Sequence, residues 1–370
     1  MFLKRLQYLR LLLFPFSFIY GIIVWIRNVL FDIGVIPSKE FDIPVISVGN
    51  ITMGGTGKTP HTEYLISLLT DEFKIAVISR GYKRKSNGFI MAEANSDYTI
   101  IGDEPRQIKQ KFPQVEMVVD ANRVEGIQKI LEYNKNIQII LLDDAFQHRY
   151  VTPGISILLI DYNKPLNKDY LFPAGTLRES SKARKRADII IITKTPENIK
   201  PVEQRIFEKK LKMFSFQKLY FTSFRYGHLI PVFDNHGNGN IELDQLKKND
   251  STVVLITGIA DPGLLKKHIE VYCQKIIDIT FPDHYNYQAK DMQTIIQRFS
   301  ALEKNHKIII TTEKDAMRFQ YFKELDEEIK SAMFYLPVTV EFLHNNTLNF
   351  NNQILNYVRV NKTDSILYKQ

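Results

Sequence analysis

The sequence lacks a cysteine framework, internal repeats and long low-complexity tracts. Its single cysteine, Cys273, excludes an intrachain disulfide and a cysteine-rich metal site, and favours a reducing compartment. No small-residue cleavage site follows the apolar start, so a signal peptide is not expected. The 370 residues, 44% of them hydrophobic and 24% charged, are typical of a globular protein with room for two cores. The net charge of +8 favours an anionic partner but does not distinguish nucleotide, nucleic acid and acidic lipid.

The first 35 residues differ from the rest of the chain and form a predicted membrane-associated helix, 1–35. Its uncharged segment of sixteen residues, Leu11–Ile26, is shorter than the roughly 20 that span a hydrocarbon core, and Pro15 interrupts it. Two interpretations stay open. One is a helix seated in the membrane surface, which Tyr20, Trp25 and the preceding basic residues suit; the other is an apolar helix packed on its own domain.

Short apolar runs then alternate with longer mixed stretches, and this pattern predicts a doubly wound α/β fold over 36–224. The runs are rich in isoleucine and valine and lack polar alternation. Such runs are typical of a mostly parallel sheet that helices cover on both faces. The predicted strands are Val45–Val48, Ile75–Ser79, Val115–Val119, Ile137–Leu142, Ile155–Ile160 and Ile189–Thr193.

The sequence becomes polar and glycine-containing around 224–250, which predicts a turn or hinge. A second βα series follows, with strands expected at Val253–Thr257, Ile276–Ile279 and Lys307–Thr311. We therefore assign 225–370 to a hinge and a smaller C-terminal α/β domain.

The segment 48–60, VGNITMGGTGKTP, predicts a phosphate-binding loop between a strand and a helix. The pattern G-x-x-x-x-G-K-[ST] ends correctly, but Thr52 replaces its first glycine, the one farthest from the transferred phosphate. Backbone N–H groups would surround the phosphates, Lys58 would bridge the β- and γ-phosphates, and Thr59 would ligate Mg²⁺. The predicted nucleotide-binding residues are Thr52, Met53, Gly54, Gly55, Thr56, Gly57, Lys58 and Thr59.

Two carboxylates, Asp143 and Asp144, end a predicted strand some 85 residues after Lys58. An isolated pair of this kind is more often a solvated turn than a metal site. At the carboxyl edge of a sheet that carries a phosphate loop, we expect one to hold Mg²⁺ and the other to orient it.

Eight segments in chain order resemble the tetraacyldisaccharide 4'-kinase family, from the apolar N-terminus to about residue 340. The segments are GNITMGGTGKTP at 49–60, RGY at 80–82, GDEP at 102–105, DDAFQHR at 143–149, FPAGTLRES at 172–180, TGIADP at 257–262, FPDHY at 281–285 and TTEKDAMRF at 311–319. One departure is Ala145, where the family commonly has glycine.

The resemblance implies a P-loop kinase that uses ATP and Mg²⁺. It would phosphorylate the 4'-hydroxyl of a tetraacyldisaccharide 1-phosphate, forming lipid IVA in lipid A biosynthesis. It also implies that Asp103 is the catalytic base and that His284, from the second domain, pairs with it when the domains close. From the residues alone, Asp103 would be a helix cap and His284 a loop histidine.

The resemblance further implies an acceptor site for an acylated glucosamine disaccharide 1-phosphate. Its candidate residues are Arg80, Tyr82, Glu104, Arg123, His148, Arg149, Arg178 and Glu179. Arginine forks suit the 1-phosphate, although each arginine also suits a surface role, and His148 also suits orienting the aspartate turn. KARKRAD at 182–188 fits a solvated or membrane-facing patch, and TTEKDAMRF receives no role.

A membrane-embedded substrate gives the N-terminal helix a purpose. We expect a peripheral or single-helix anchor at the cytoplasmic face of the inner membrane, and no nucleic acid or obligate protein partner. One rival is a membrane-associated P-loop switch ATPase of the partitioning type, but that subgroup carries lysine where this chain has Met53. The other rival, a nucleic-acid-binding protein, lacks a recognised motif, and the basic residues are scattered.

Overall fold

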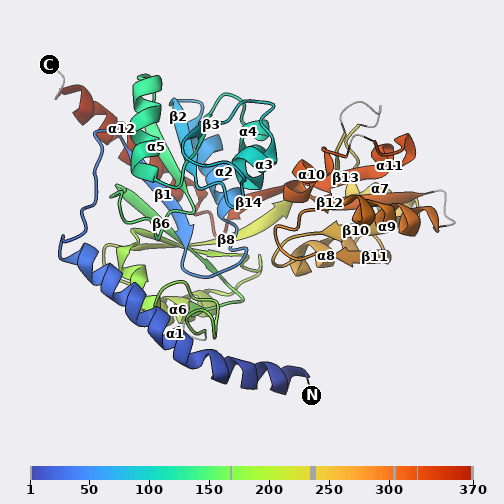
Figure 1. Ribbon diagram of the computed structural model, residues 1–370, viewed down its shortest axis with the longest axis horizontal. Coiled ribbons are helices and arrows are strands. Elements are labelled where there is room, and N and C mark those ends of the chain that lie inside the picture. Colours follow the sequence, from blue (N-terminus) through green and yellow to red (C-terminus); the bar gives the residue numbers. More distant parts are fainter. Residues whose placement is uncertain (1, 167–168, 234–238, 303–305, 323, 368–370) are drawn as a thin grey trace.

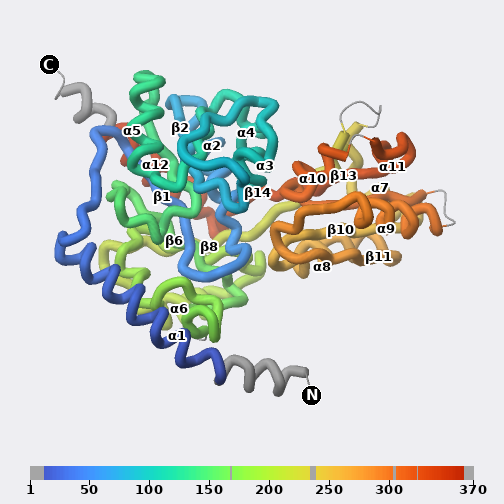
Figure 2. Tube along the Cα trace, viewed as in Figure 1, coloured from blue at the N-terminus to red at the C-terminus, as the bar shows by residue number. Residues whose placement is uncertain are grey.

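The computed structural model describes residues 2–166, 169–233, 239–302, 306–322 and 324–367. It has a larger and a smaller lobe side by side, each built around its own sheet (Figure 1). The Cα trace passes between the lobes after β8 (Lys218–Tyr226) and again before β14 (Val338–Phe342), as Figure 2 shows. The two connections touch, because the Gly227 amide donates to the Pro337 carbonyl at 3.1 Å.

The sheet of the larger lobe has nine strands in the described residues, in the order β14-β8-β7-β6-β1-β5-β2-β4-β3. Among the strands described in this sheet, only β3 on β4 and β14 on β8 pair antiparallel. The remaining bounds are β1 Val45–Asn50, β2 Ile75–Ser79, β3 Ile90–Met91, β4 Glu116–Val119, β5 Ile139–Asp143, β6 Ile155–Asp161 and β7 Ile189–Thr193. All six residues of β1 are buried, because helices cover both faces of the sheet. The predicted parallel α/β fold is confirmed.

Helices of the larger lobe place the loops of the candidate site at the carboxyl edge of this sheet. Their bounds are α2 Lys58–Leu69, α3 Tyr98–Ile101, α4 Asp103–Lys111, α5 Arg123–Tyr133, the 3₁₀ helix Ser181–Arg186, α6 Pro201–Leu211 and α12 Thr347–Leu367. On one face of the sheet, Leu65 and Leu69 of α2 and Phe350 and Ile354 of α12 share a core with the strands.

The smaller lobe has a five-stranded sheet in its described residues, in the order β11-β10-β12-β13-β9. Its strands are β9 Ile230–Pro231, β10 Thr252–Thr257, β11 Lys275–Thr280, β12 Lys307–Thr312 and β13 Met333–Leu336. Its helices are α7 Leu243–Lys248, α8 Gly263–Glu270, α9 Ala289–Ser300, α10 Glu313–Phe319 and α11 Glu327–Ala332. The three strands expected in this lobe are present.

The expected extent of the smaller domain, 225–370, is wrong at its C-terminal end. β14 pairs with β8 of the larger sheet, with Val338 opposite Tyr226 and Phe342 opposite Thr222. The fully buried Val358 of α12 lies in the core of the larger lobe. The expected hinge around 224–250 also contains the end of β8, β9 and α7, and its residues 234–238 lie outside the described residues.

The N-terminal helix α1, Phe2–Asp32, continues through Pro15 and runs along the larger lobe (Figure 1). One side docks on the 170–180 loop, where the Ser17 hydroxyl accepts from the Ala174 amide at 2.8 Å and the Tyr20 hydroxyl donates to the Arg178 carbonyl at 2.8 Å. Residues 12–32 are long and apolar enough to cross a membrane: an 18-residue window in this stretch has a mean hydropathy of 1.6, and 6% of that window is buried. The interpretation as a helix packed on its own domain therefore holds for one narrow side. A wide apolar side stays exposed, and its seating in a membrane surface stays a prediction.

Candidate active site

The phosphate loop has the backbone that its glycines require. Gly54 and Gly57 have φ values of 102° and 87°, and Gly57 precedes the first turn of α2. A Cβ at Gly57 would come within 2.7 Å of the Phe224 ring. Thr52, the departure from the usual pattern, is buried and forms an isolated antiparallel bridge with Leu177. Because this side of the loop is extended and paired, a glycine is not needed at position 52.

Lys58 and the two aspartates at the end of β5 meet beside this loop. The Asp143 carboxylate accepts from the Thr62 hydroxyl at 3.1 Å and the Ser79 hydroxyl at 3.3 Å. Asp144 has a left-handed backbone with φ 47°, and its carboxylate lies 3.7 Å from Lys58 Nζ. Burial and then the neighbouring Asp144 raise the pKa of Asp143 to about 6. Burial opposes ionisation of Asp144, but Lys58 and Arg178 outweigh it and lower the pKa of this carboxyl. The raised pKa of Asp143 is expected for a carboxylate that a bound cation would stabilise.

Basic side chains gather around His148, close to the two aspartates. Burial, followed by Arg123, Arg27 and Arg80, lowers the pKa of His148 to about 4. Arg123 is buried and its Nη2 contacts the Asp143 carbonyl at 3.4 Å. Within the described residues, Arg123 Nε and His148 Nε2 are buried without a hydrogen-bond partner. Unpaired polar nitrogens in a basic cluster suit an anionic ligand.

The other predicted acceptor residues hold the surrounding structure together. Arg178 Nη1 lies 3.2 Å from each oxygen of the Asp144 carboxylate. Arg149 binds Asp32 of α1 at 2.7 Å. Glu179 is buried and accepts a fork from Arg186. In this structure, Arg149 and Glu179 therefore fasten α1 and the 170–180 loop, and their expected contact with the acceptor stays a prediction.

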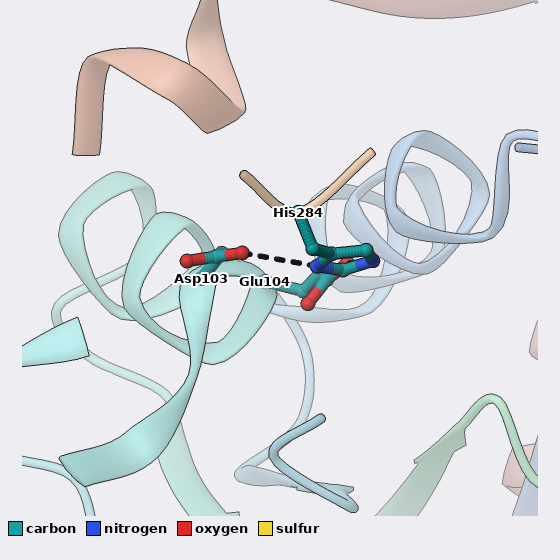
Figure 3. Close-up of side chains that lie close together, drawn as sticks. All are labelled: Asp103, Glu104 and His284. Carbon is teal, nitrogen blue, oxygen red and sulfur yellow. Dashed lines mark hydrogen bonds and ion pairs between the residues drawn. The ribbon is translucent and has the colours of Figure 1, made fainter. Parts of the chain in front are cut away.

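Asp103 and His284 form a pair between the lobes, as Figure 3 shows. Asp103 opens α4 directly after Gly102, whose φ is 96°, and His284 lies in the loop after β11 with φ 55°. His284 Nδ1 is 3.1 Å from Asp103 Oδ2. The Tyr82 ring packs edge-on against the His284 ring, with centroids 4.8 Å apart. The pairing expected on domain closure is already present, and Tyr82 adjoins it.

Helix α10 brings two further cations to this pair, and both were missed from the sequence. Arg318 donates to both oxygens of Asp103, with Nε 3.0 Å from Oδ1 and Nη2 in contact with Oδ2. Lys314 Nζ lies 2.9 Å from His284 Nε2 and 3.1 Å from Glu104 Oε1. The lysine and arginine in TTEKDAMRF are four residues apart, a spacing that places them on one side of a helix.

Asp103, Glu104 and His284 also come close enough together to be considered as metal ligands. However, the Lys314 ammonium contacts the imidazole and the Glu104 carboxylate, so a cation is already present at this cluster. The cluster therefore fits acid–base chemistry better than metal binding.

A cleft of about 800 Å³ between the lobes lies next to the phosphate loop. Phe224 and Tyr226 of β8 and His268 and Tyr272 of the smaller lobe are among the residues that line it. Lys194 crosses the cleft edge, 2.8 Å from Asp161 and 3.8 Å from Asp261 of the smaller lobe. Interpreting 224–250 as a hinge concealed Phe224 and Tyr226, which have no motif of their own.

Comparisons with known proteins agree with this geometry. The family model for tetraacyldisaccharide-1-P 4'-kinase (LpxK) matches residues 9–359. The tetraacyldisaccharide 4'-kinase of Bacteroides thetaiotaomicron is 47% identical over 359 residues, covering 95% of this chain and 94% of that protein. That of Flavobacterium johnsoniae is 42% identical over 353 residues, covering 95% and 98%.

A solved structure is also similar over nearly the whole chain. Aquifex aeolicus LpxK in complex with ATP is 30% identical, with a TM-score of 0.72 and coverage of 95% of this chain and 99% of that chain. These matches favour the lipid-kinase prediction over the switch ATPase. The chain therefore belongs to the tetraacyldisaccharide-1-P 4'-kinase family.

Proposed function

We propose that this protein transfers the γ-phosphate of ATP to the 4'-hydroxyl of a tetraacyldisaccharide 1-phosphate, the reaction that forms lipid IVA. The observation that carries the proposal is the contact of Asp103 with His284 between the lobes, in a chain that also has an intact phosphate loop. Family membership and the names of the relatives support the same substrate class.

The donor site fits a nucleoside triphosphate and Mg²⁺. Left-handed glycines leave the loop backbone open to phosphate, and the N-terminus of α2 presents free N–H groups. Thr59, Asp143 and Asp144 offer the hard oxygen ligands that Mg²⁺ prefers. When bound, Mg²⁺ would neutralise charge on the β- and γ-phosphate oxygens. The aromatic walls of the neighbouring cleft suit the nucleoside.

The transfer needs a base, charge neutralisation and alignment. Asp103 accepts the proton of the 4'-hydroxyl. At the same time the hydroxyl oxygen forms a bond to the γ-phosphorus, and the bond from the γ-phosphorus to the bridging β-phosphate oxygen breaks, so ADP leaves. His284 donates from Nδ1 to Asp103 and fixes the direction of the carboxylate. Lys58 stabilises the charge that develops between the β- and γ-phosphates.

Two features suit the acceptor: a basic cluster for its phosphate and an apolar surface for its acyl chains. The unpaired Arg123 Nε and His148 Nε2, with Arg80 nearby, suit the 1-phosphate. The exposed apolar side of α1 suits the bilayer that contains the acyl chains, at the cytoplasmic face of the inner membrane. With both assignments, the sugar would lie between the lipid surface and Asp103.

The variant Asp103→Ala tests the assignment of the base. We expect phosphate transfer to fall by roughly 10²- to 10⁴-fold, the usual contribution of a general base, while the Kd for ATP changes little. Filter binding of labelled ATP and transfer to the lipid are measured on the same preparation. Loss of ATP binding would instead give Asp103 a structural or metal-binding role.

A further inference from the structure

Helix α10 of the smaller lobe presents two cations, one turn apart, to the proposed catalytic pair. Lys314 and Arg318 have side chains that are 17% and 2% exposed. The Thr312 hydroxyl caps the helix by accepting from the Asp315 amide at 3.1 Å. Residues four apart on a helix share a side, so this short helix directs both cations toward Asp103 and His284.

Arg318 is fixed on both sides of its guanidinium. One edge forms the fork on Asp103, and Nη1 donates to the Tyr285 carbonyl at 2.8 Å and to Asp315 Oδ1 at 3.3 Å. Asp315 is itself fully buried and accepts from the Gly258 amide at 2.8 Å. A planar fork held in this way determines the direction of the carboxylate that it binds.

The contacts leave a defined position on Asp103 for the acceptor. A carboxylate has about four lone-pair positions, two on each oxygen. Among the described residues, Oδ2 accepts from His284 and Arg318, and Oδ1 accepts from Arg318. The remaining position is on Oδ1, and a hydroxyl that gives its proton to Asp103 must approach there.

Lys314 determines which nitrogen of His284 carries hydrogen. An ammonium can only donate, so at 2.9 Å from Lys314 Nζ the His284 Nε2 must accept. The hydrogen of the neutral ring is then on Nδ1, where it is donated to Asp103 Oδ2. Lys314 is held in place by Glu104 at 3.1 Å and Asp283 at 3.4 Å.

We propose that Lys314 and Arg318 are positioning residues for the reaction. Arg318 aims the Asp103 carboxylate so that Oδ1 faces the acceptor, and Lys314 keeps His284 in the tautomer that donates to Asp103. The catalytic consequence rests on the proposed function, whereas the effect on Asp103 and His284 themselves does not.

The charge balance around Asp103 supplies a measurable signature. Burial alone would raise the pKa of Asp103, but hydrogen bonds from His284 and Arg318 lower it to about 2. Removing a guanidinium beside an aspartate raises its pKa by about 1–3 units. The charged and titratable groups that face Asp103 are Tyr98 of α3, Glu104 of α4, Asp283, His284 and Tyr287 of the loop after β11, and Lys314, Asp315 and Arg318 of α10.

The first experiment measures the Asp103 carboxyl in Arg318→Gln and Arg318→Lys. Carboxyl-labelled aspartate is titrated by ¹³C NMR, with Asp103→Asn identifying the signal, and transfer is measured across pH. We expect the Asp103 titration to move up by about 1–3 units in R318Q and less in R318K, and transfer at the optimum to fall roughly 10- to 100-fold in R318Q. Arg359→Gln, which removes an exposed fork on Glu72, is the matched control.

The second experiment measures the tautomer of His284 in Lys314→Met by ¹⁵N NMR of labelled histidine. We expect the wild-type ring to carry its hydrogen on Nδ1, and the variant to lose this single tautomer. Lys266→Met, which removes an exposed ion pair with Asp278, is the control. An unchanged His284 spectrum would overturn the assignment for Lys314.

The two readouts separate this inference from the proposed function. If the wild type transfers phosphate to the lipid but the Asp103 titration and the pH profile stay unchanged in R318Q, the positioning role of Arg318 is wrong. If the wild type transfers no phosphate to the lipid, the proposed function fails, and the NMR titrations alone decide whether α10 controls the pair. Thermal unfolding of each variant checks that it is folded.

Discussion

At the scale of single residues, the backbone conformation of Gly57 determines the shape of the phosphate loop. Its φ of 87° is left-handed, and an added Cβ would come within 2.7 Å of the Phe224 ring. Gly88 has a similar φ of 70° but no heavy atom within 4 Å of an added Cβ. Comparing alanine substitutions at the two glycines therefore distinguishes backbone strain, which both share, from a collision in the phosphate loop, which only Gly57 has.

We expect Gly57→Ala to weaken ATP binding by at least about 10-fold, because the loop must shift to relieve the collision. A left-handed alanine alone costs about 1–2 kcal/mol, and Gly88→Ala should cost that in stability while leaving the Kd for ATP unchanged. Equilibrium binding of labelled ATP and thermal unfolding measure both. Equal losses of affinity in the two variants would contradict a specific role for Gly57.

The sequence predicted the residues of the site that stand in motifs, and missed those whose role depends on tertiary contact. GDEP and FPDHY identified Asp103 and His284 by resemblance, and the structure brings them together. No local pattern could reveal that Arg318 reaches Asp103, because 215 residues separate them in the chain. Arg149 was expected at the acceptor, yet it binds Asp32, since a sequence does not show which carboxylate an arginine meets.

At the scale of elements, α1 combines a packed side with an exposed apolar side. Phe16, Phe18, Ile23 and Trp25 each have about 60% or more of their surface exposed. Buried apolar area is worth about 25 cal/mol per Å², so this side gains from insertion into a lipid interface. The exposed aromatic side chains suit the boundary between water and lipid.

We predict that the double variant Phe18→Asp and Trp25→Asp loses binding to anionic phospholipid vesicles by roughly 10-fold or more, because two charges would enter the apolar region. Val271→Asp, at an equally exposed apolar residue of the smaller lobe, is the control and should bind as the wild type does. Sedimentation with vesicles measures both. Undiminished binding of the double variant would contradict an anchor at α1.

Periodicity and composition predicted the strands well and their partners poorly. Continuous apolar runs were sufficient for β1, β2 and β7, because a parallel strand is buried on both faces. The same reasoning could not assign β14, whose five residues give no indication of which sheet they join. β14 pairs with β8, and the paired residues are more than 100 positions apart in the sequence.

At the scale of the whole molecule, a cluster of largely buried charged side chains joins the two lobes. Lys111 of α4 lies 2.6 Å from Glu63 of α2 and 3.3 Å from Glu313 of α10. Burial and then the Glu313 carboxylate raise the pKa of Glu63 to about 7. The folded protein therefore binds a proton that the unfolded chain has already released between about pH 4.5 and 7.

This linkage predicts that the free energy of unfolding decreases as pH rises through that window. Glu63→Gln should remove part of the decrease, because glutamine does not titrate. The free energy of unfolding of E63Q, compared with that of the wild type, should rise by on the order of 1–3 kcal/mol from pH 4.5 to pH 8. A difference between the two proteins that is the same at every pH does not count toward this rise. Urea unfolding in detergent at several pH values measures it. Glu132→Gln, an exposed site on α5, is the control. A difference between E63Q and the wild type that does not change with pH would argue against a raised pKa at Glu63.

The central claim is that the phosphate loop and the Asp103–His284 pair together phosphorylate a lipid sugar. The most direct test supplies ATP labelled at the γ-phosphate, Mg²⁺ and the tetraacyldisaccharide 1-phosphate in detergent, and follows the label. We expect the label to appear on the lipid at the 4' position, with little release to water. Release of inorganic phosphate at the same rate with and without the disaccharide, and no labelled lipid, would contradict the account.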